Sequence, residues 1–234
     1  KTFTLVEDEG QHSHKLGFAL VHKWNDDLTL KERRARLVGR GYMQVETKDY
    51  ALRGAYSATP TATSIRCFAN FTLAIHGKTC LADVVKAFTL SKMDREFYVE
   101  QPYLHLPNMT VLGKNGKPKL ALLHMALEGF KQSSNLFQVM HTSFLTNTEV
   151  VKRADFVFTQ STTEPCLFIC HSSRGIIGAI VWIDDIWISY NGDGFFLDFK
   201  KVYKQRFPST FEEPCQKYVG VNIQHSREDR MISL

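Results

Sequence analysis

Apolar residues between positions 176 and 190 fall into two runs separated by a pair of carboxylates. Ile176 to Ile183 is apolar and rich in β-branched residues, Asp184 and Asp185 are acidic, and Ile186 to Tyr190 is again β-branched and aromatic. Runs of this length and composition are typical of buried strands. The pattern therefore predicts a β-hairpin with two adjacent carboxylates at its tip.

Strand and helix patterns are mixed along the rest of the chain. Strand-like runs occur at 3–6, 17–21, 97–102, 165–170 and 217–223, and a run at 79–88 reads as a strand leading into a turn or helix. Apolar residues recur at helical spacing over 64–75, over 120–145 with a break at Gly129, and over 195–207. This mixture predicts an α+β fold.

Composition indicates a globular protein whose net charge permits binding to polyanions. A chain of 234 residues with 44% hydrophobic and 12% aromatic content can bury one large core or two intimately packed subdomains. Lys and Arg number 29 against 24 acidic residues, giving a net charge of +5. Such a balance permits nucleic-acid binding without requiring it.

Cysteine usage and hydropathy predict the compartment. The five cysteines form no CxxC pair, which favours a reducing environment. The sequence contains neither a signal-like leader nor an uncharged apolar stretch long enough to span a bilayer. We therefore expect a soluble protein of the cytoplasm or nucleus with no membrane partner. Because the chain starts at Lys1 and stops at Leu234, we expect a fragment of a longer protein.

The acidic pair at the hairpin tip is the strongest chemical signal. Two neighbouring carboxylates between apolar strands lose hydration and repel each other, and a divalent cation removes that cost. The alternative is an exposed turn, and Glu212-Glu213 shows that adjacency alone is weak support. Asp83 is likewise isolated in an apolar run and requires a partner.

Two further clusters carry weaker signals. Lys31 to Tyr42 gathers basic residues around two glycines, a pattern suited to a phosphate chain or, equally, to a solvated charged face. Cys166, Cys170 and His171 have a spacing that suggests zinc, but on a strand these side chains would not converge.

With these pieces in place, the chain resembles the reverse transcriptase domain of copia-type LTR retrotransposons (Pseudoviridae-like Pol polyproteins) over nearly its whole length. The motifs occur in the family's order and are Arg34–Tyr42 with Asp49-Tyr50 (KARLVARGF and DY in the family), Asp83–Phe88 (DVKNAF), Tyr98–Pro102 (YMEQP), Gly129–Gln132 (GLKQ), Glu164–Phe168 (DPCLF), Trp182–Asp185 (YVDD) and Tyr218–Ile223 (YFLGIEI).

The resemblance implies a function, a cofactor and roles for particular residues. It implies an RNA-directed DNA polymerase that transfers dNTPs onto a primer, with RNA or DNA template-primer and dNTPs as partners. Asp83, Asp184 and Asp185 would be the catalytic residues and would hold two Mg²⁺ ions, or Mn²⁺, about 3.5–4 Å apart. The implied substrate-binding residues are Arg34, Arg36 and Arg40 at the triphosphate, Phe88 at the sugar, and Lys131 and Gln132 near the templating pair.

The resemblance also implies an architecture, the right-hand polymerase fingers and palm with an antiparallel palm sheet and packed helices. Fingers would cover about 1–80 and 95–155, and palm about 80–95 and 155–234, with thumb and RNase H outside this chain. Glu128 and Trp182 both stand where the family has tyrosine. These departures leave open an alternative, a domesticated or degenerate, non-catalytic module that acts as an RNA-binding or structural subunit of a larger ribonucleoprotein or Pol assembly.

Overall fold

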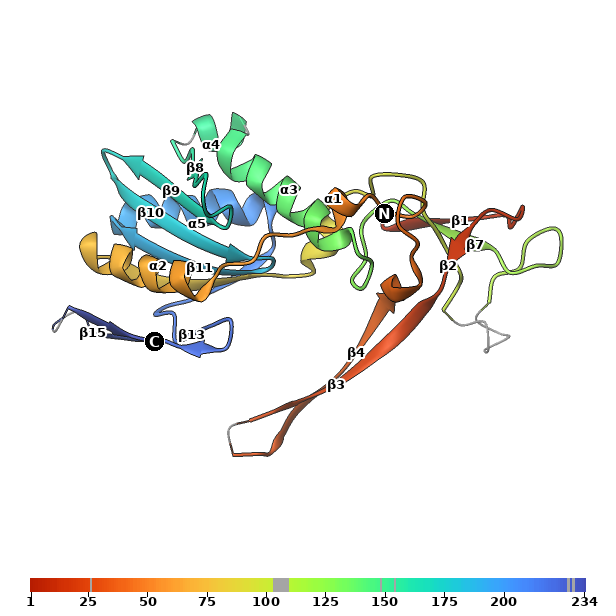
Figure 1. Ribbon diagram of the computed structural model, residues 1–234, viewed down its shortest axis with the longest axis horizontal. Helices are drawn as coiled ribbons and strands as arrows, with labels where there is room; N and C mark the ends of the chain where they lie inside the picture. The colour runs from red at the N-terminus through yellow and green to blue at the C-terminus, as the bar shows by residue number, and fades with distance from the viewer. Residues whose placement is uncertain (26, 103–109, 148, 154, 227, 229) are drawn as a thin grey trace. The chain divides into compact units, whose positions relative to one another are not determined.

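The computed structural model describes residues 1–25, 27–102, 110–147, 149–153, 155–226, 228 and 230–234 (Figure 1). It divides the chain into two compact units. Unit 1 contains residues 1–56 and 88–137, and unit 2 contains residues 57–87 and 138–234. The assignment of fingers and palm to particular residues stays a prediction. None of the described helices has the length and hydropathy needed to cross a membrane.

Unit 1 is built around a four-stranded sheet in the order β1-β7-β6-β2, beside a separate β3–β4 hairpin. Its elements are β1 (Phe3–Val6), β2 (Ser13–His14), β3 (Leu16–Trp24), β4 (Leu30–Gly39), η1 (Gly41–Met43), α1 (Leu52–Ala55), β6 (Tyr98–Val99) and β7 (Leu120–Leu123). The buried side chains of Phe97, Val99, Leu123 and Phe130 form its core.

Unit 2 is built around a six-stranded sheet in the order β12-β5-β11-β10-β9-β8. Its elements are α2 (Ala62–Ala74), β5 (Lys78–Val84), α4 (Glu149–Arg153), β8 (Thr159–Gln160), β9 (Leu167–Ser172), β10 (Gly175–Trp182), β11 (Asp185–Asn191), α5 (Asp193–Arg206), β12 (Ser209–Glu212), β13 (Lys217–Tyr218), β14 (Val221–Asn222), β15 (Gln224–Ser226) and β16 (Met231–Ser233). The two remaining elements, η2 (Ala87–Leu90) and α3 (Ser133–Asn147), carry the chain from one unit into the other.

The β10–β11 hairpin forms as predicted, and its strands are buried on both faces (Figure 1). Alternate residues of β11 point to opposite faces of the sheet. On one face Trp187 packs edge-to-face on Phe68 of α2, with ring centroids 5.1 Å apart. On the other face Tyr190 stacks on Phe196 of α5 at 3.8 Å. Each such pair contributes about 0.5–1.5 kcal/mol beyond its buried area, so both helices fix the strand that carries Asp185.

The fold is α+β as predicted, but the predicted helix over 120–145 is wrong in its first part. Leu120–Leu123 is instead strand β7, which lies between β1 and β6 in the sheet of unit 1. A central strand is apolar on both faces, so its pattern over four residues cannot be told from that of a buried helix. The helical part of this stretch starts only at Ser133, beyond Gly129, whose φ is +93°.

Candidate active site

Asp83 and Asp185 lie directly opposite each other on neighbouring antiparallel strands. Asp83 is the penultimate residue of β5, and Asp185 is the first residue of β11. Directly opposed residues of an antiparallel pair project from the same face of the sheet, with Cβ atoms about 4.5–5.5 Å apart. Two acidic residues separated by about a hundred positions in the chain are thereby placed side by side.

Asp184 lies in the tight turn that joins β10 to β11. Trp182 pairs with Asp185, so the loop between them contains only Ile183 and Asp184. Ile183 has φ +55°, a left-handed conformation that is strained for a β-branched residue. The backbone carbonyl of Asp184 accepts a hydrogen bond from the Val84 amide at 3.0 Å. This bond fixes the hairpin tip against the end of β5.

Asp83 and Asp185 carry charges of the same sign when both are ionised. Within the described part of the chain, neither Asp83 nor Asp185 forms an ion pair with a basic side chain. Partial burial, and then the negative charges of Asp184 and Asp83, raise the pKa of Asp185 to about 6. The folded chain therefore holds an acidic group that favours either a proton or a cation.

The donor set suits Mg²⁺, which prefers hard carboxylate oxygens and is bound through one or two of them together with substrate phosphates. Among the described residues, the ligand atoms of His12, His14 and Asp49 lie within 4.8 Å of one another. The carboxylate oxygens of Asp83, Asp184 and Asp185 are not all this close together.

A second hairpin belongs to the same unit as the aspartates. The run predicted as one strand over 217–223 is instead a short hairpin of β13 and β14, with Val219 and Gly220 at positive φ in its turn. The buried Tyr218 hydroxyl donates to the Ile180 carbonyl of β10 at 3.1 Å. That bond ties this hairpin to the strand that leads into the acidic tip.

The basic segment of the sequence forms strand β4 of unit 1. Arg34 and Arg36 are two residues apart on this strand and share a face. Arg34 pairs with Glu32 at 2.9 Å, and Arg36 pairs with Glu128 at 2.9 Å. Arg40 follows the strand, and its amide donates to the Lys15 carbonyl at 3.1 Å. Two of the three predicted triphosphate ligands are thus engaged with carboxylates.

The other predicted substrate-binding residues also belong to unit 1. Gln132 is buried, and its side-chain oxygen accepts a hydrogen bond from Gln44 at 2.9 Å. The Lys131 amine donates to the Tyr50 hydroxyl at 3.0 Å. Phe88 lies half-buried in η2. Their roles toward a nucleotide stay predictions.

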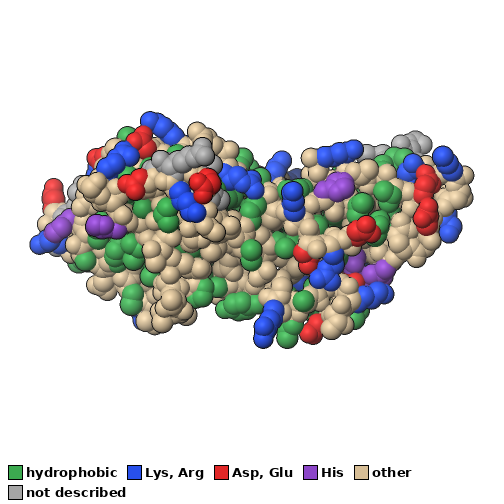
Figure 2. Space-filling view, turned by 90° about the horizontal axis from the view of Figure 1, so that it is seen from above, with side chains coloured by type: hydrophobic (Ala, Val, Ile, Leu, Met, Phe, Trp, Pro, Cys, Tyr) green, Lys and Arg blue, Asp and Glu red, His purple; other side chains and the backbone are tan. Residues whose placement is uncertain are grey.

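Basic side chains do not gather into one patch on the face that Figure 2 draws. Lys and Arg side chains are spread across it and alternate with Asp and Glu. This distribution agrees with the modest net charge of +5.

Cys166, Cys170 and His171 do not form a metal site. Both cysteines are buried, whereas His171, next to Cys170 on strand β9, is exposed. Burial raises the pKa of the Cys166 thiol to about 12 and that of Cys170 to about 11, so both stay protonated.

The whole chain matches one family. A family model described as "Reverse transcriptase (RNA-dependent DNA polymerase)" matches residues 1–234. The retrovirus-related Pol polyprotein from transposon TNT 1-94 of Nicotiana tabacum is 25% identical over 235 residues, covering 100% of this chain and 16% of that protein. The corresponding polyproteins from transposons RE2 and RE1 of Arabidopsis thaliana are 27% identical over 199 residues and 26% identical over 222 residues. They cover 85% and 94% of this chain.

The chain spans only 13% to 16% of the length of these three relatives. Among solved structures, one described as "Structure of apo telomerase from Candida Tropicalis truncated from C-terminal domain" has a TM-score of 0.45 at 8% identity, covering 98% of this chain and 56% of that chain. That likeness is too low to assign a fold. The match to the family model, together with the motif order, shows that the chain belongs to the reverse transcriptase (RNA-dependent DNA polymerase) family, with copia-type retrotransposon Pol polyproteins as its relatives.

Proposed function

We propose that this chain is the polymerase domain of a copia-type Pol polyprotein and that it adds dNTPs to a primer on an RNA template. The single observation that carries the proposal is the register of β5 and β11, which sets Asp83 opposite Asp185 beside Asp184. Family membership alone says nothing about retained activity. Carboxylates that can hold two metal ions are the part of a polymerase that catalysis cannot lack.

Asp83, Asp184 and Asp185 would hold the two Mg²⁺ ions. When bound, Mg²⁺ supplies Lewis-acid activation of the primer 3′-hydroxyl and neutralises charge on the triphosphate and leaving pyrophosphate. The protein contributes the positions of these ligands, because strand pairing and the short turn fix Asp83 and the hairpin tip in place. Asp185 must be ionised to act as a ligand, so a proton and Mg²⁺ compete for this carboxyl group, whose pKa is raised.

Residues of unit 1 would bind the nucleotide. Arg34 and Arg36 would pair with triphosphate oxygens. Their present ion pairs with Glu32 and Glu128 would break when the nucleotide binds. Phe88 would lie against the sugar and favour deoxynucleotides, and Lys131 and Gln132 would lie near the templating pair. The template-primer, the remainder of a Pol polyprotein, and a cytoplasmic or nuclear location belong to the same proposal.

Primer extension tests the proposal directly. The chain is incubated with an RNA template, a DNA primer, dNTPs and Mg²⁺, and extension is compared between wild type, Asp185→Asn and Asp198→Asn. Asp198 is a partly exposed carboxylate of unit 2 that pairs with Arg174, so it serves as a matched control. We expect wild type and Asp198→Asn to extend the primer. Asp185→Asn should lose at least about 100-fold in rate, because losing even an outer-shell partner of a metal ligand costs about 10–100-fold. Equal extension by wild type and Asp185→Asn would exclude catalysis at this site.

A specific contact favours a second candidate, a non-catalytic RNA-binding or structural module. Glu128, at the family's tyrosine position, pairs with Arg36, a predicted triphosphate ligand. A chain that had lost catalysis would tolerate this pairing. This candidate predicts RNA binding that is unchanged by removal of Mg²⁺ and no extension by any variant.

A further inference from the structure

Two histidines and an aspartate meet in unit 1, and none of the three has been given a catalytic or substrate-binding role above. His14 is the second residue of β2, which pairs in parallel with β6, and His12 precedes that strand. Because side chains two apart on an extended segment share a face, both imidazoles point the same way. Asp49 reaches them from the segment between the bridged residues Glu46 and Tyr50.

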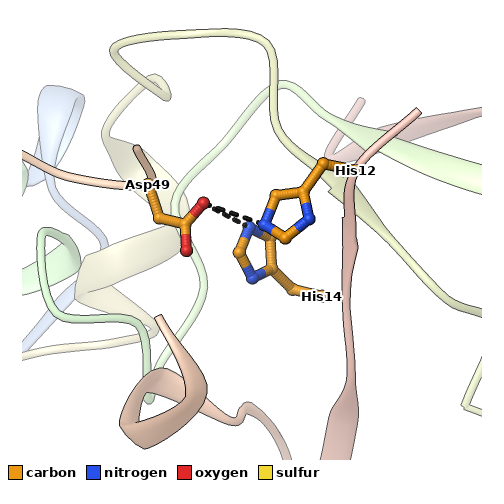
Figure 3. A group of neighbouring side chains, drawn as sticks. All are labelled: His12, His14 and Asp49. Atoms are coloured by element: carbon orange, nitrogen blue, oxygen red, sulfur yellow. Dashed lines mark hydrogen bonds and ion pairs between the residues drawn. The ribbon is translucent and has the colours of Figure 1, made fainter. Parts of the chain in front are cut away.

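All three ligand atoms converge on one point, as Figure 3 shows. The Oδ1 atom of Asp49 lies 3.0 Å from the Nε2 atom of His12 and 3.4 Å from the Nε2 atom of His14. The three ligand atoms lie within 4.8 Å of one another. Zinc–nitrogen bonds of about 2.0–2.1 Å in a tetrahedron place ligand atoms roughly 3.3 Å apart. The two distances from Asp49 to the imidazoles are therefore close to those of a tetrahedral site.

Supporting contacts hold two of the three ligands in place. The Oδ2 atom of Asp49 accepts the Val45 amide at 2.7 Å, which turns Oδ1 toward the imidazoles. The His14 ring stacks on Phe97 at 4.2 Å between centroids and meets the edge of Phe130 at 5.9 Å. Partners that orient ligands in this way are typical of metal sites, and losing one costs about 10–100-fold in affinity.

Two members of the group are buried. His14 is 6% exposed and Asp49 is 3% exposed. A buried carboxylate is costly unless it is paired, hydrogen-bonded or bound to a metal ion.

One side of the group is open to solvent. The His12 side chain is 46% exposed. The group lines a pocket of about 270 Å³, ample for a water molecule, whose share of liquid volume is about 30 Å³. The other residues that line this pocket are Gln11, Lys48, Arg95, Glu96, Phe97 and Tyr98. Three protein ligands and an accessible fourth position are the arrangement of an open zinc site.

We infer that His12, His14 and Asp49 bind a single Zn²⁺ ion, with water as the fourth ligand, and that the ion ties β2 to the segment that carries Asp49. Two imidazoles favour Zn²⁺ over Mg²⁺, which prefers oxygen ligands. This site therefore differs in its ligands from the aspartate cluster of unit 2. The inference of a zinc site does not depend on whether the chain polymerises DNA.

Zinc titration of the full, tag-free chain tests the inference. After treatment with a chelator, Zn²⁺ alone is added in competition with a chromophoric chelator, and the same protein is loaded with Co²⁺ for its visible spectrum. We expect one Zn²⁺ per chain, a tetrahedral Co²⁺ spectrum and a rise in Tm with zinc. His12→Ala, at an exposed position that the fold does not need, should weaken zinc binding at least about tenfold and abolish the Tm rise.

Matched variants separate this site from adventitious binding. His22→Ala removes an exposed histidine of β3 in the same unit and should bind zinc like wild type. Asp49→Asn keeps the side-chain volume and an acceptor for Val45, and should lose affinity as His12→Ala does. Absence of stoichiometric zinc in the wild type overturns the inference. Unchanged zinc affinity in His12→Ala or Asp49→Asn also overturns it. A loss of zinc binding in Cys67→Ser, which removes the exposed thiol, would place the ion at that cysteine and overturn it as well.

Discussion

Asp83 and Asp185 are register partners on β5 and β11, so two carboxylates face each other across neighbouring strands with no basic side chain paired to either among the described residues. Such an arrangement destabilises the fold at neutral pH, because each charge raises the free energy of the other. Stability given up at one position is typical of a functional site.

Asp185→Asn should stabilise the folded chain at the same time as it removes polymerase activity. The pKa of Asp185 is raised to about 6 from an ordinary 3.8. Folding therefore favours the protonated acid, and the stability it confers is present below pH 3.8 and lost as pH rises through 6. At pH 8 the variant avoids this loss, which gives a free energy of unfolding higher by roughly 1–3 kcal/mol, at about 1.4 kcal/mol per pKa unit.

Urea denaturation at several pH values measures this effect. The gain should be constant above about pH 7 and shrink as the pH falls from about 6 to about 4. Asp198→Asn, at a partly exposed carboxylate held by Arg174 and Lys201, should show no such gain. An Asp185→Asn variant that is less stable than wild type at pH 8 would contradict the unfavourable ionisation of Asp185 in the folded chain.

Magnesium should stabilise the wild type and not Asp83→Asn. If the site binds Mg²⁺ with a Kd of about 1 mM, then about 10 mM Mg²⁺ adds roughly 1.4 kcal/mol to the free energy of unfolding. For a chain of this size that corresponds to a rise in Tm of about 3–5 °C. Differential scanning fluorimetry at matched ionic strength, with NaCl replacing MgCl₂ in the control, checks the difference. An equal rise in both proteins would place the bound Mg²⁺ elsewhere.

Glu128 should weaken nucleotide binding by competing for Arg36. The two side chains pair at 2.9 Å and are both substantially exposed, so their pairing is weak and reversible. Glu128→Gln frees the guanidinium and should lower the KM for dNTPs about two- to fivefold, the scale of an exposed pair of about 0.5–1 kcal/mol. Arg36→Ala should raise that KM. Steady-state kinetics with a fixed template-primer give both values, and a KM that both substitutions leave unchanged removes Arg36 from the nucleotide site.

The strongly patterned elements could be predicted from the sequence. The β10–β11 hairpin formed because two β-branched runs flank a loop too short for anything but a tight turn. The helix predicted over 64–75 is present as α2, and its N-cap is Thr61, whose side chain accepts a hydrogen bond from the Ser64 amide. Strand β7 was missed because an apolar segment of four residues carries no period that separates strand from helix.

Of the candidate site, the identity of the acidic residues could be predicted but not their surroundings. The residues around Glu128 and Arg36 do not predict that these two side chains, 92 positions apart in the sequence, form an ion pair. The cluster of His12, His14 and Asp49 was missed although its signal was present, because alternate histidines on a strand share a face. The third ligand, Asp49, lies more than thirty positions further along the chain. Its approach to the histidines depends on tertiary packing, which a short stretch of sequence does not encode.

His141 should make unit 2 sensitive to acid. Its ring is fully enclosed, and its Nε2 atom hydrogen-bonds to the buried Tyr203 hydroxyl at 2.8 Å. Burial lowers the pKa of His141 from 6.5 to about 3. The neutral ring therefore contributes stability that is complete above pH 6.5 and is lost as pH falls towards 3, by at most about 1.4 kcal/mol per pH unit.

His141→Gln tests this linkage, since glutamine keeps a hydrogen-bond partner for Tyr203 but does not titrate. We expect the free energy of unfolding of the variant to depend less steeply on pH between 6.5 and 5 than that of wild type, measured by urea denaturation. His171→Gln, at an exposed position of β9, should retain the wild-type slope. Asp185 titrates in the same pH range and changes the stability in the opposite direction, so the contribution of His141 is the difference in slope between variant and wild type. An identical slope in both proteins would show that the His141 ring is protonated without unfolding.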